Sequence, residues 1–136
     1  MKKLVIGVLA ILLLSCGQKE LPKKDLSTET LINSFKQAGV AIQNITIPER
    51  NPKGPLPNSY KEHISFTISE IAPKGGQAFI CEKKAYCDPL FEYFDAFKAL
   101  GGPYYFRSKN GLVVIQLNKG LSVQTAEKME AAIQNL

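Results

Sequence analysis

Hydrophobic residues recur along this chain with two alternating periods, one typical of helices and the other typical of strands. The helical period predicts helices over residues 27–38, 88–100 and 122–133. Ser27 or Asp25 can cap the first of these helices, and Ser122 can cap the third. The Asp88-Pro89 pair favours the start of the second helix, because proline is tolerated at the first helical position.

The strand period occurs in several segments, each bounded by turn residues. The predicted strands cover residues 40–47, 63–69, 77–82, 103–107 and 112–117. The first is expected to turn Ile45 and Ile47 inward, with a slip near Asn44. The second alternates strictly, so its apolar residues are expected to face the core and its polar residues, including His63, to face solvent.

The predicted elements follow the order α-β-β-β-α-β-β-α. Asn110-Gly111 is a strong hairpin signal between the last two strands, and a proline-rich loop over residues 48–57 separates the first two. Helices interspersed with hairpins predict an α+β fold, in which an antiparallel sheet of about four to five strands has helices packed on one face.

The first residues follow a different pattern, that of a secretory signal. A basic start precedes an apolar run over residues 4–14, which is too short to span a bilayer, and a small residue precedes Cys16. Leu13-Leu14-Ser15-Cys16 resembles the lipobox of bacterial lipoproteins. The resemblance implies cleavage before Cys16 and attachment of diacylglycerol to its thiol, usually with acylation of its amine. Residues 108–117 and the helix after them resemble small bacterial lipoproteins of unassigned role, which implies no chemistry.

Lipidation of this kind implies a permanent membrane tether, because each buried methylene contributes about 0.8 kcal/mol and more than one acyl chain is attached. We expect a signal peptide over residues 1–15, the lipidated cysteine and a flexible tether over residues 16–26, and a single α+β domain over residues 27–136. In this class, Gly17 after the cysteine favours the outer membrane over the inner one. The expected localisation is the cell envelope, at the periplasmic face of the outer membrane in an organism with two membranes.

The two remaining cysteines, Cys81 and Cys87, form an even pair in an exported protein, which favours a disulfide. Closing so short a loop would contribute about 2.4 kcal/mol. Reduced thiols are an alternative, and so is a redox pair, although redox centres favour two intervening residues and here there are five. A metal site would need more ligands, and His63 is the only histidine.

The charge balance argues against a nucleic-acid partner. The chain has 17 basic and 12 acidic residues and a formal net charge of +5, which loss of the two signal-peptide lysines lowers to +3. So small an excess does not predict binding to a polyanion. The expected partners are the membrane, through the lipid anchor, and an envelope protein, with no nucleic acid, no cofactor and no metal.

Three stretches carry candidate binding residues. The loop closed by the two cysteines would project its side chains outward, and a rigid loop binds at a lower entropic cost. The proline-rich loop is a second candidate, because loops of this length often carry function. The aromatic strand over residues 103–107 must turn one side away from the core, which leaves Tyr105, or the pair Tyr104 and Phe106, as a candidate contact surface. Each stretch also has a purely structural interpretation: the cysteine loop as a solvated turn, the proline-rich loop as a spacer, and the aromatic strand as part of the core. The candidate residues are Lys83, Lys84 and Tyr86, then Arg50 and Lys53, and Tyr105.

No catalytic constellation is recognisable in the sequence. His63 has no Ser or Cys motif that would make it a general base. Glu92 and Asp95 lie three residues apart on a predicted helix, where a solvated helix face explains them as well as a carboxylate pair does.

These features together predict a membrane-anchored, non-enzymatic binding or assembly module of the cell envelope. One alternative is an envelope thiol oxidoreductase that uses Cys81 and Cys87. Another is a small inhibitor of an envelope or foreign enzyme, with the loop over residues 83–86 as its wedge.

Overall fold

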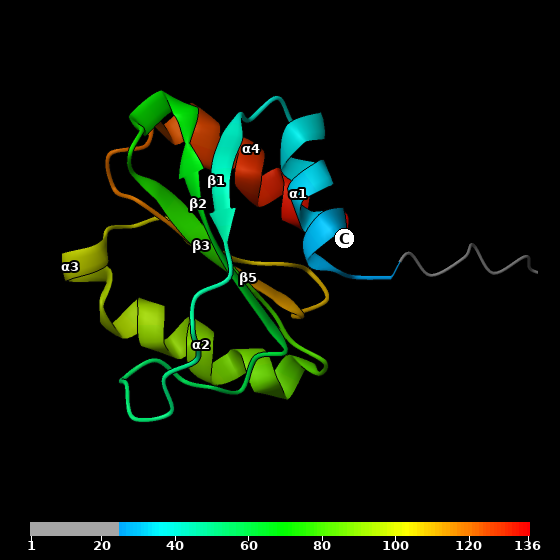
Figure 1. The fold of residues 1–136 in the computed structure, drawn as a ribbon, viewed down its shortest axis with the longest axis vertical. Helices are drawn as coiled ribbons and strands as arrows, with labels where there is room; N and C mark the ends of the chain where they lie inside the picture. Colours follow the sequence, from blue (N-terminus) through cyan, green and yellow to red (C-terminus); the bar gives the residue numbers. More distant parts are fainter. Residues whose placement is uncertain (1–24) are drawn as a thin grey trace, which may run out of the picture.

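The computed structural model describes residues 25–136, which form a five-stranded antiparallel sheet with helices on both faces (Figure 1). The helices are α1 (Thr28–Gln37), α2 (Lys84–Ala96), α3 (Lys98–Gly101), α4 (Val123–Gln134) and the short 3-10 helix η1 (Ser69–Ile71). The strands are β1 (Ile42–Thr46), β2 (Glu62–Ile68), β3 (Gly75–Ile80), β4 (Tyr105–Arg107) and β5 (Val113–Leu117). They lie in the order β1-β2-β3-β5-β4. The predicted α+β fold and element order are confirmed, with η1 and α3 added.

The predicted signal peptide, Cys16 and Gly17 lie outside the described residues. The last two residues of the predicted tether, 25 and 26, are among the described residues, and Leu26 packs against the core. Within residues 25–136, no helix is long and apolar enough to cross a membrane.

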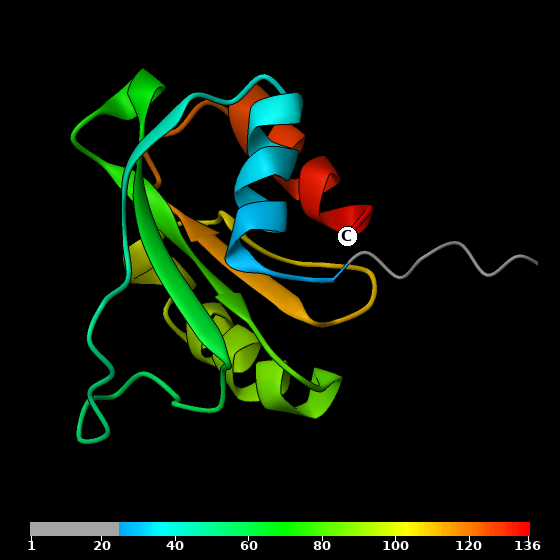
Figure 2. The same ribbon diagram turned by 45° about the vertical axis from the view of Figure 1, so that its right-hand side comes forward.

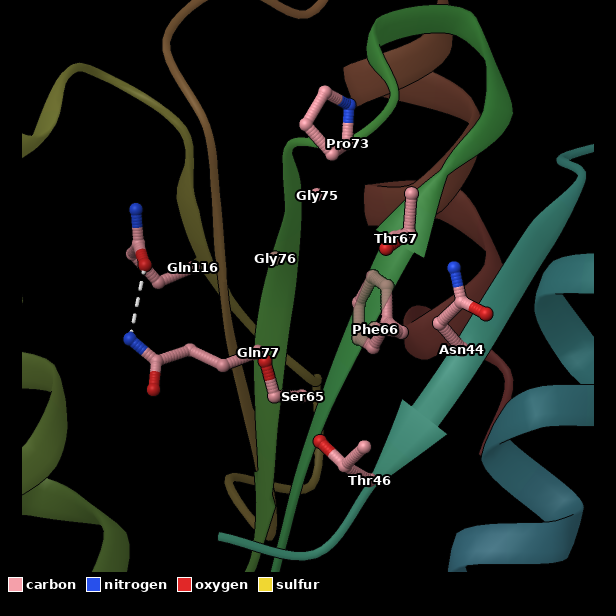
Figure 3. Close-up of a pocket in the computed structure, with 10 residues that line it drawn as sticks. All are labelled: Asn44, Thr46, Ser65, Phe66, Thr67, Pro73, Gly75, Gly76, Gln77 and Gln116. Carbon is pink, nitrogen blue, oxygen red and sulfur yellow. Dashed lines mark hydrogen bonds between the residues drawn. The ribbon is translucent and has the colours of Figure 1, made fainter.

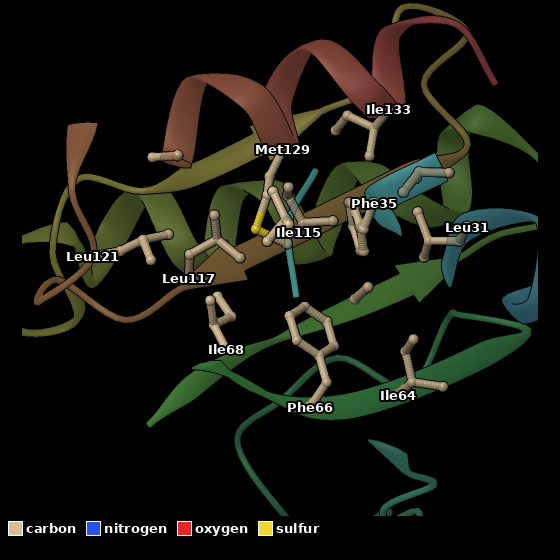
Figure 4. Close-up of a cluster of buried hydrophobic side chains, with 14 of the residues drawn as sticks. Leu31, Phe35, Ile64, Phe66, Ile68, Ile115, Leu117, Leu121, Met129 and Ile133 are labelled. Carbon is tan, nitrogen blue, oxygen red and sulfur yellow. The ribbon is translucent and has the colours of Figure 1, made fainter. Parts of the chain in front are cut away.

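α1 and α4 lie side by side on one face of the sheet and cover the larger part of the core (Figures 2 and 4). The strands contribute the inward residues of their alternating pattern, and the helices contribute their apolar stripes. The buried residues of this cluster are Leu31, Phe35, Val40, Ile64, Phe66, Ile68, Ala78, Ile80, Val113, Ile115, Leu117, Leu121, Ala126, Met129 and Ile133.

Serines cap both of these helices: Ser27, one of the two predicted caps, begins α1, and Ser122 begins α4 as predicted. Ser27 and Ser122 each accept a hydrogen bond from the backbone N–H three residues further on. Glu62, which begins β2, and Glu70, which follows it in η1, accept from backbone N–H groups at the starts of α1 and α4. Negative charge at a helix N-terminus is stabilising, so β2 and η1 help to hold both helices in place.

α2 covers the opposite face, so the expectation that the helices pack on one face is wrong for this helix. Its buried residues Leu90 and Phe94 belong to a second cluster with Phe79 of β3 and Val114 of β5. Here β3 and β5 each carry three consecutive buried apolar residues. Such runs are typical of strands covered on both faces, because successive side chains point in opposite directions.

α2 also begins earlier than the Asp88-Pro89 pair predicted. Its first residue is Lys84, so Pro89 lies inside the helix, where a proline forfeits a helical hydrogen bond. A disulfide joins Cys87 in the first turn of α2 to Cys81 just after β3, and both cysteines belong to the second apolar cluster. This buried bridge holds the first turn against the sheet and offsets the lost hydrogen bond.

β1 is an edge strand with a bulge. Asn44 has a positive φ of 50°, and the pairing with β2 shifts register between Gln43 and Thr46. The predicted slip near Asn44 is confirmed. The predicted inward orientation of Ile45 and Ile47 is wrong: both side chains are exposed, Ile47 by 81%.

Candidate functional site on the open sheet face

One row of side chains crosses the whole sheet on the face that carries α2. The strand registers pair Thr46 with Ser65, Ser65 with Gln77, Gln77 with Gln116, and Gln116 with Tyr105. Each strand therefore contributes one residue, and every one of them is polar and uncharged. We call these five residues the polar row. Neighbouring strands lie about 4.8 Å apart, so the row extends over about 19 Å.

α2 covers the neighbouring row and leaves the polar row open. The covered row pairs His63, Phe79, Val114 and Arg107 across four strands. Phe79 and Val114 are fully buried beneath the helix. The members of the polar row are half-buried, apart from Thr46, which is exposed. The boundary between apolar and polar side chains on this face therefore follows the edge of α2.

A hollow of about 470 Å³ lies over the centre of the polar row (Figure 3). Its lining residues are Asn44, Thr46, Ser65, Phe66, Thr67, Pro73, Gly75, Gly76, Gln77 and Gln116. A Cβ atom on Gly75 would lie 1.9 Å from the backbone oxygen of Phe66, so a side chain is excluded there. Glycine at this position keeps part of the hollow's floor at the level of the backbone.

A second hollow of about 310 Å³ adjoins the first, and Gln77 and Gln116 line both. It lies between the sheet and the end of α2, and most of its other lining side chains are aromatic. The rings of Tyr93 and Phe97 lie 4.8 Å apart, and Phe97 is 45% exposed. The two glutamines thus have a polar hollow on one side and an aromatic wall on the other. The aromatic lining residues are Tyr93, Phe94, Phe97 and Tyr105.

A chain of hydrogen bonds orients the two glutamines. Gln77 Nε2 donates to Gln116 Oε1 at 3.0 Å, and Gln116 Nε2 donates to the backbone oxygen of Leu117 at 3.0 Å. The side-chain oxygen of Gln77, Oε1, lies 3.0 Å from His63 Nε2. Because an amide oxygen only accepts, His63 Nε2 carries a proton and donates it to Gln77. Each amide nitrogen keeps a further N–H, and each amide oxygen a further lone pair, for a ligand.

His63 forms the first hydrogen bond of this series and is itself covered by aromatic residues. Its ring stacks on Phe79 with centroids 4.1 Å apart, and Tyr60 packs against its edge. Burial lowers the pKa of His63, an effect that the hydrogen bond to Gln77 partly offsets and that nearby Arg50 reinforces. The expectation that His63 faces solvent is wrong, because its ring packs against Phe79 and Tyr60 and is only 9% exposed.

Charged side chains are absent from the linings of both hollows in the described part of the chain. Charged residues make up 21% of the whole sequence, so this absence distinguishes the surface. The nearby carboxylate of Asp95 accepts a hydrogen bond from the Tyr105 hydroxyl at 2.6 Å and lies 3.6 Å from the Lys98 ammonium. These partners, Tyr105 first, lower the pKa of Asp95, and the same hydrogen bond raises the pKa of Tyr105.

The residues predicted for the disulfide loop lie at the other end of α2. The disulfide is confirmed, and its two cysteines are 2% and 0% exposed. Lys83, Lys84 and Tyr86 are exposed as expected, but residues 84–87 form the first turn of a helix instead of a loop. α2 spans about 20 Å, which separates these side chains from the second hollow at its C-terminal end.

In the proline-rich loop, Arg50 makes hydrogen bonds to residues that follow it in the chain. Arg50 donates hydrogen bonds to the backbone oxygens of Asn58 and Tyr60, and its guanidinium lies 4.1 Å from the centre of the Tyr60 ring. Lys53 is exposed and lines neither hollow. Tyr105 is the one predicted binding residue that belongs to the polar row.

Sequence reasoning missed the other members of the polar row. Ser65 was expected to face solvent, and Gln77 and Gln116 lie in predicted strands to which no faces were assigned, but outward polar positions are usually solvated surface. Their common location depends on strand register, which is a property of the folded chain. The residues that the structure describes include no group of three or more His, Cys, Asp or Glu side chains that could hold a metal ion.

Comparison with known proteins identifies no relative: no family model matches the chain, and neither a curated protein nor a solved structure is significantly similar to it.

Proposed function

We propose that this protein is a non-enzymatic binding module, anchored in the cell envelope through Cys16, and that the polar row is its binding surface. The observation that carries this proposal is the row itself, in which five hydrogen-bonding side chains from five strands are left open beside a covering helix. A sheet face that serves structure alone needs no such aligned set of uncharged groups next to two ligand-sized hollows.

The row is also ordered before any ligand arrives. The hydrogen bonds from His63 through Gln77 to Gln116 fix both amide groups. Side chains that are already immobilised lose less conformational entropy on binding. This preorganisation supports a recognition role for the surface.

The position of the chain's start agrees with an anchored module. The described chain begins beside α1, near the C-terminus and on the face opposite α2 (Figure 2). The polar row lies on the other face of the sheet, away from this point.

The two alternative functions receive less support from the geometry. A thiol oxidoreductase must expose a cysteine to its partner, whereas Cys81 and Cys87 are buried in an apolar cluster. An inhibitory wedge must extend into an active site, whereas residues 84–87 form the first turn of α2, which the disulfide at Cys87 holds against the sheet.

Site-specific photo-crosslinking in intact cells tests the proposal. A photoreactive phenylalanine analogue replaces Thr67, beside the polar row, or Gln124, an exposed residue of α4 on the other face. We expect discrete adducts from position 67 and none from position 124. Equal labelling from both positions, or none from position 67, would contradict a binding role for the row. Reduction of the bridge in the folded protein by a mild dithiol would instead favour the oxidoreductase.

A further inference from the structure

We propose that the ligand of the polar row is a neutral saccharide chain. This inference rests on the proposed function and names the chemical class of its ligand. Three properties of the surface carry it: the absence of charge among its described lining residues, the kind of hydrogen-bonding groups it presents, and the aromatic wall at one side.

The first property restricts the ligand to neutral molecules. A charged group that enters either hollow loses water and finds no opposite charge among the described side chains that line it. Desolvation of an unpaired ion is costly, so phosphorylated, nucleic-acid and strongly acidic or basic peptide ligands fit poorly. Charged residues are common in the rest of the sequence, so the neutrality of this surface does not reflect a low overall content of charged residues.

The second property requires a ligand rich in groups that both donate and accept. The row presents two hydroxyls and two amides, each of which can donate and accept, and a phenol whose proton is donated to Asp95 and whose oxygen can still accept. Sugar hydroxyls meet this requirement at short, regular intervals. A peptide that binds as an added strand is recognised through the backbone of a sheet edge, whereas the polar row lies on a sheet face and offers side chains.

The third property matches the apolar face of a sugar ring. One side of a pyranose exposes C–H groups, and burial of these groups against an aromatic ring removes apolar surface from water. Phe97 and Tyr93 provide such rings in the hollow that the two glutamines also line, and Phe97 is 45% exposed. A sugar stacked there places its edge hydroxyls towards Gln77 and Gln116, which line both hollows.

The dimensions favour a chain over a single sugar. The hollows, of about 470 and 310 Å³, meet at the two glutamines, and the row continues across all five strands for about 19 Å. A linear oligosaccharide that crosses the strands would contact the aromatic wall at one end and the hydroxyl groups of Ser65 and Thr46 at the other.

NMR titration with two neutral tetrasaccharides tests the inference. The full chain is held in micelles of a non-glycosidic detergent, because a sugar-headed detergent would compete. The probes are tetra-N-acetylchitotetraose, whose acetamido groups can pair with the glutamine amides, and cellotetraose, which offers hydroxyls alone. We expect at least one to shift the side-chain amide resonances of Gln77 and Gln116, and the comparison shows whether acetamido groups contribute.

Matched variants locate the binding. Gln116→Ala removes one amide of the row, and Phe97→Ala removes part of the aromatic wall; each is expected to weaken binding by about tenfold. Gln124→Ala and Val123→Ala make equivalent changes at exposed positions of α4 and should leave the affinity unchanged. Thermal unfolding confirms that each variant retains its fold.

The inference is overturned if neither tetrasaccharide shifts the side-chain amide resonances of Gln77 and Gln116. It is also overturned if the Gln116→Ala and Phe97→Ala variants bind the saccharide as tightly as the unaltered protein does. Its failure can be distinguished from failure of the proposed function. Adducts from position 67 without saccharide binding would leave a binding module with a different ligand. The absence of both would remove the binding role itself.

Discussion

At the scale of single residues, the molecule combines a buried histidine with two exposed amides. His63 is held between Phe79 and Tyr60, and its one ring proton orients Gln77. Burial disfavours the charged form of this ring, because a cation is poorly solvated beneath the aromatic layer. The order of the polar row therefore depends on a residue that does not face the ligand.

The burial of His63 predicts a loss of stability in mild acid. Burial holds the pKa of His63 below its ordinary value of 6.5. The unfolded chain takes up a proton near pH 6.5 while the folded chain resists it, so the contribution to stability is complete above pH 6.5 and decreases as the pH falls below it. Urea unfolding at pH 7.5 and 5.5 should show this decrease.

The control for this experiment is the variant His63→Gln, which cannot titrate in this range. We expect a smaller difference between the two pH values for the variant than for the unaltered protein. The same dependence in both proteins would show that another group is responsible. Glu70 and Asp95 do not interfere, because their lowered pKa values place their contributions at more acidic pH.

At the scale of elements, α2 decides the character of the sheet's second face. Its apolar side covers the row that contains Phe79 and Val114, and the polar row begins where this cover ends. The helix is attached at both ends of its contact with the sheet, by the disulfide near its start and by Phe94 near its end. Binding at the polar row therefore depends on the packing of α2.

We predict that Leu90→Ala destabilises the protein by about 2–5 kcal/mol, the cost of a cavity in a packed core. Leu90 is fully buried between α2 and the sheet. Leu100→Ala is the matched control, because its side chain is 76% exposed, and it should change stability by less than about 0.5 kcal/mol. Denaturant unfolding measures both, and similar effects of the two changes would contradict the position of α2.

At the scale of the whole molecule, the sheet separates two functions in the proposed scheme. One face carries α1, α4 and the start of the described chain, and the other carries α2 and the polar row (Figure 2). In this scheme the ligand binds on the face of the sheet opposite to the one on which the described residues begin.

The anchor itself predicts a specific mature form. Mass spectrometry of the protein from its native envelope should find that residues 1–15 are missing and that Cys16 carries acyl chains. Cys16→Ser should abolish the acylation, because the thiol is its acceptor, whereas Ser15→Ala keeps a small residue before the cleavage site and should preserve it. An unacylated mature chain with a different first residue would contradict the anchor.

Features that depend on neighbours in sequence could be predicted before the structure. Helix starts at Ser27 and Ser122 follow from local capping chemistry, and the strand over residues 63–69 follows from strict alternation. The pairing of Cys81 with Cys87 follows from their number and short separation. The consecutive apolar residues of β3 and β5 are a local signal that both faces of the sheet are covered, although packing of helices on one face was predicted.

The sequence by itself thus determined the elements, their order, the disulfide and the expectation of a lipid anchor, because each is specified by residues close together along the chain. The tertiary structure alone decided that His63 is buried and that Thr46, Ser65, Gln77, Gln116 and Tyr105 form one row. The physical reason is that strand register and the placement of α2 arise from packing between distant segments. Local periodicity assigns each side chain a face, and only the folded sheet assigns it neighbours.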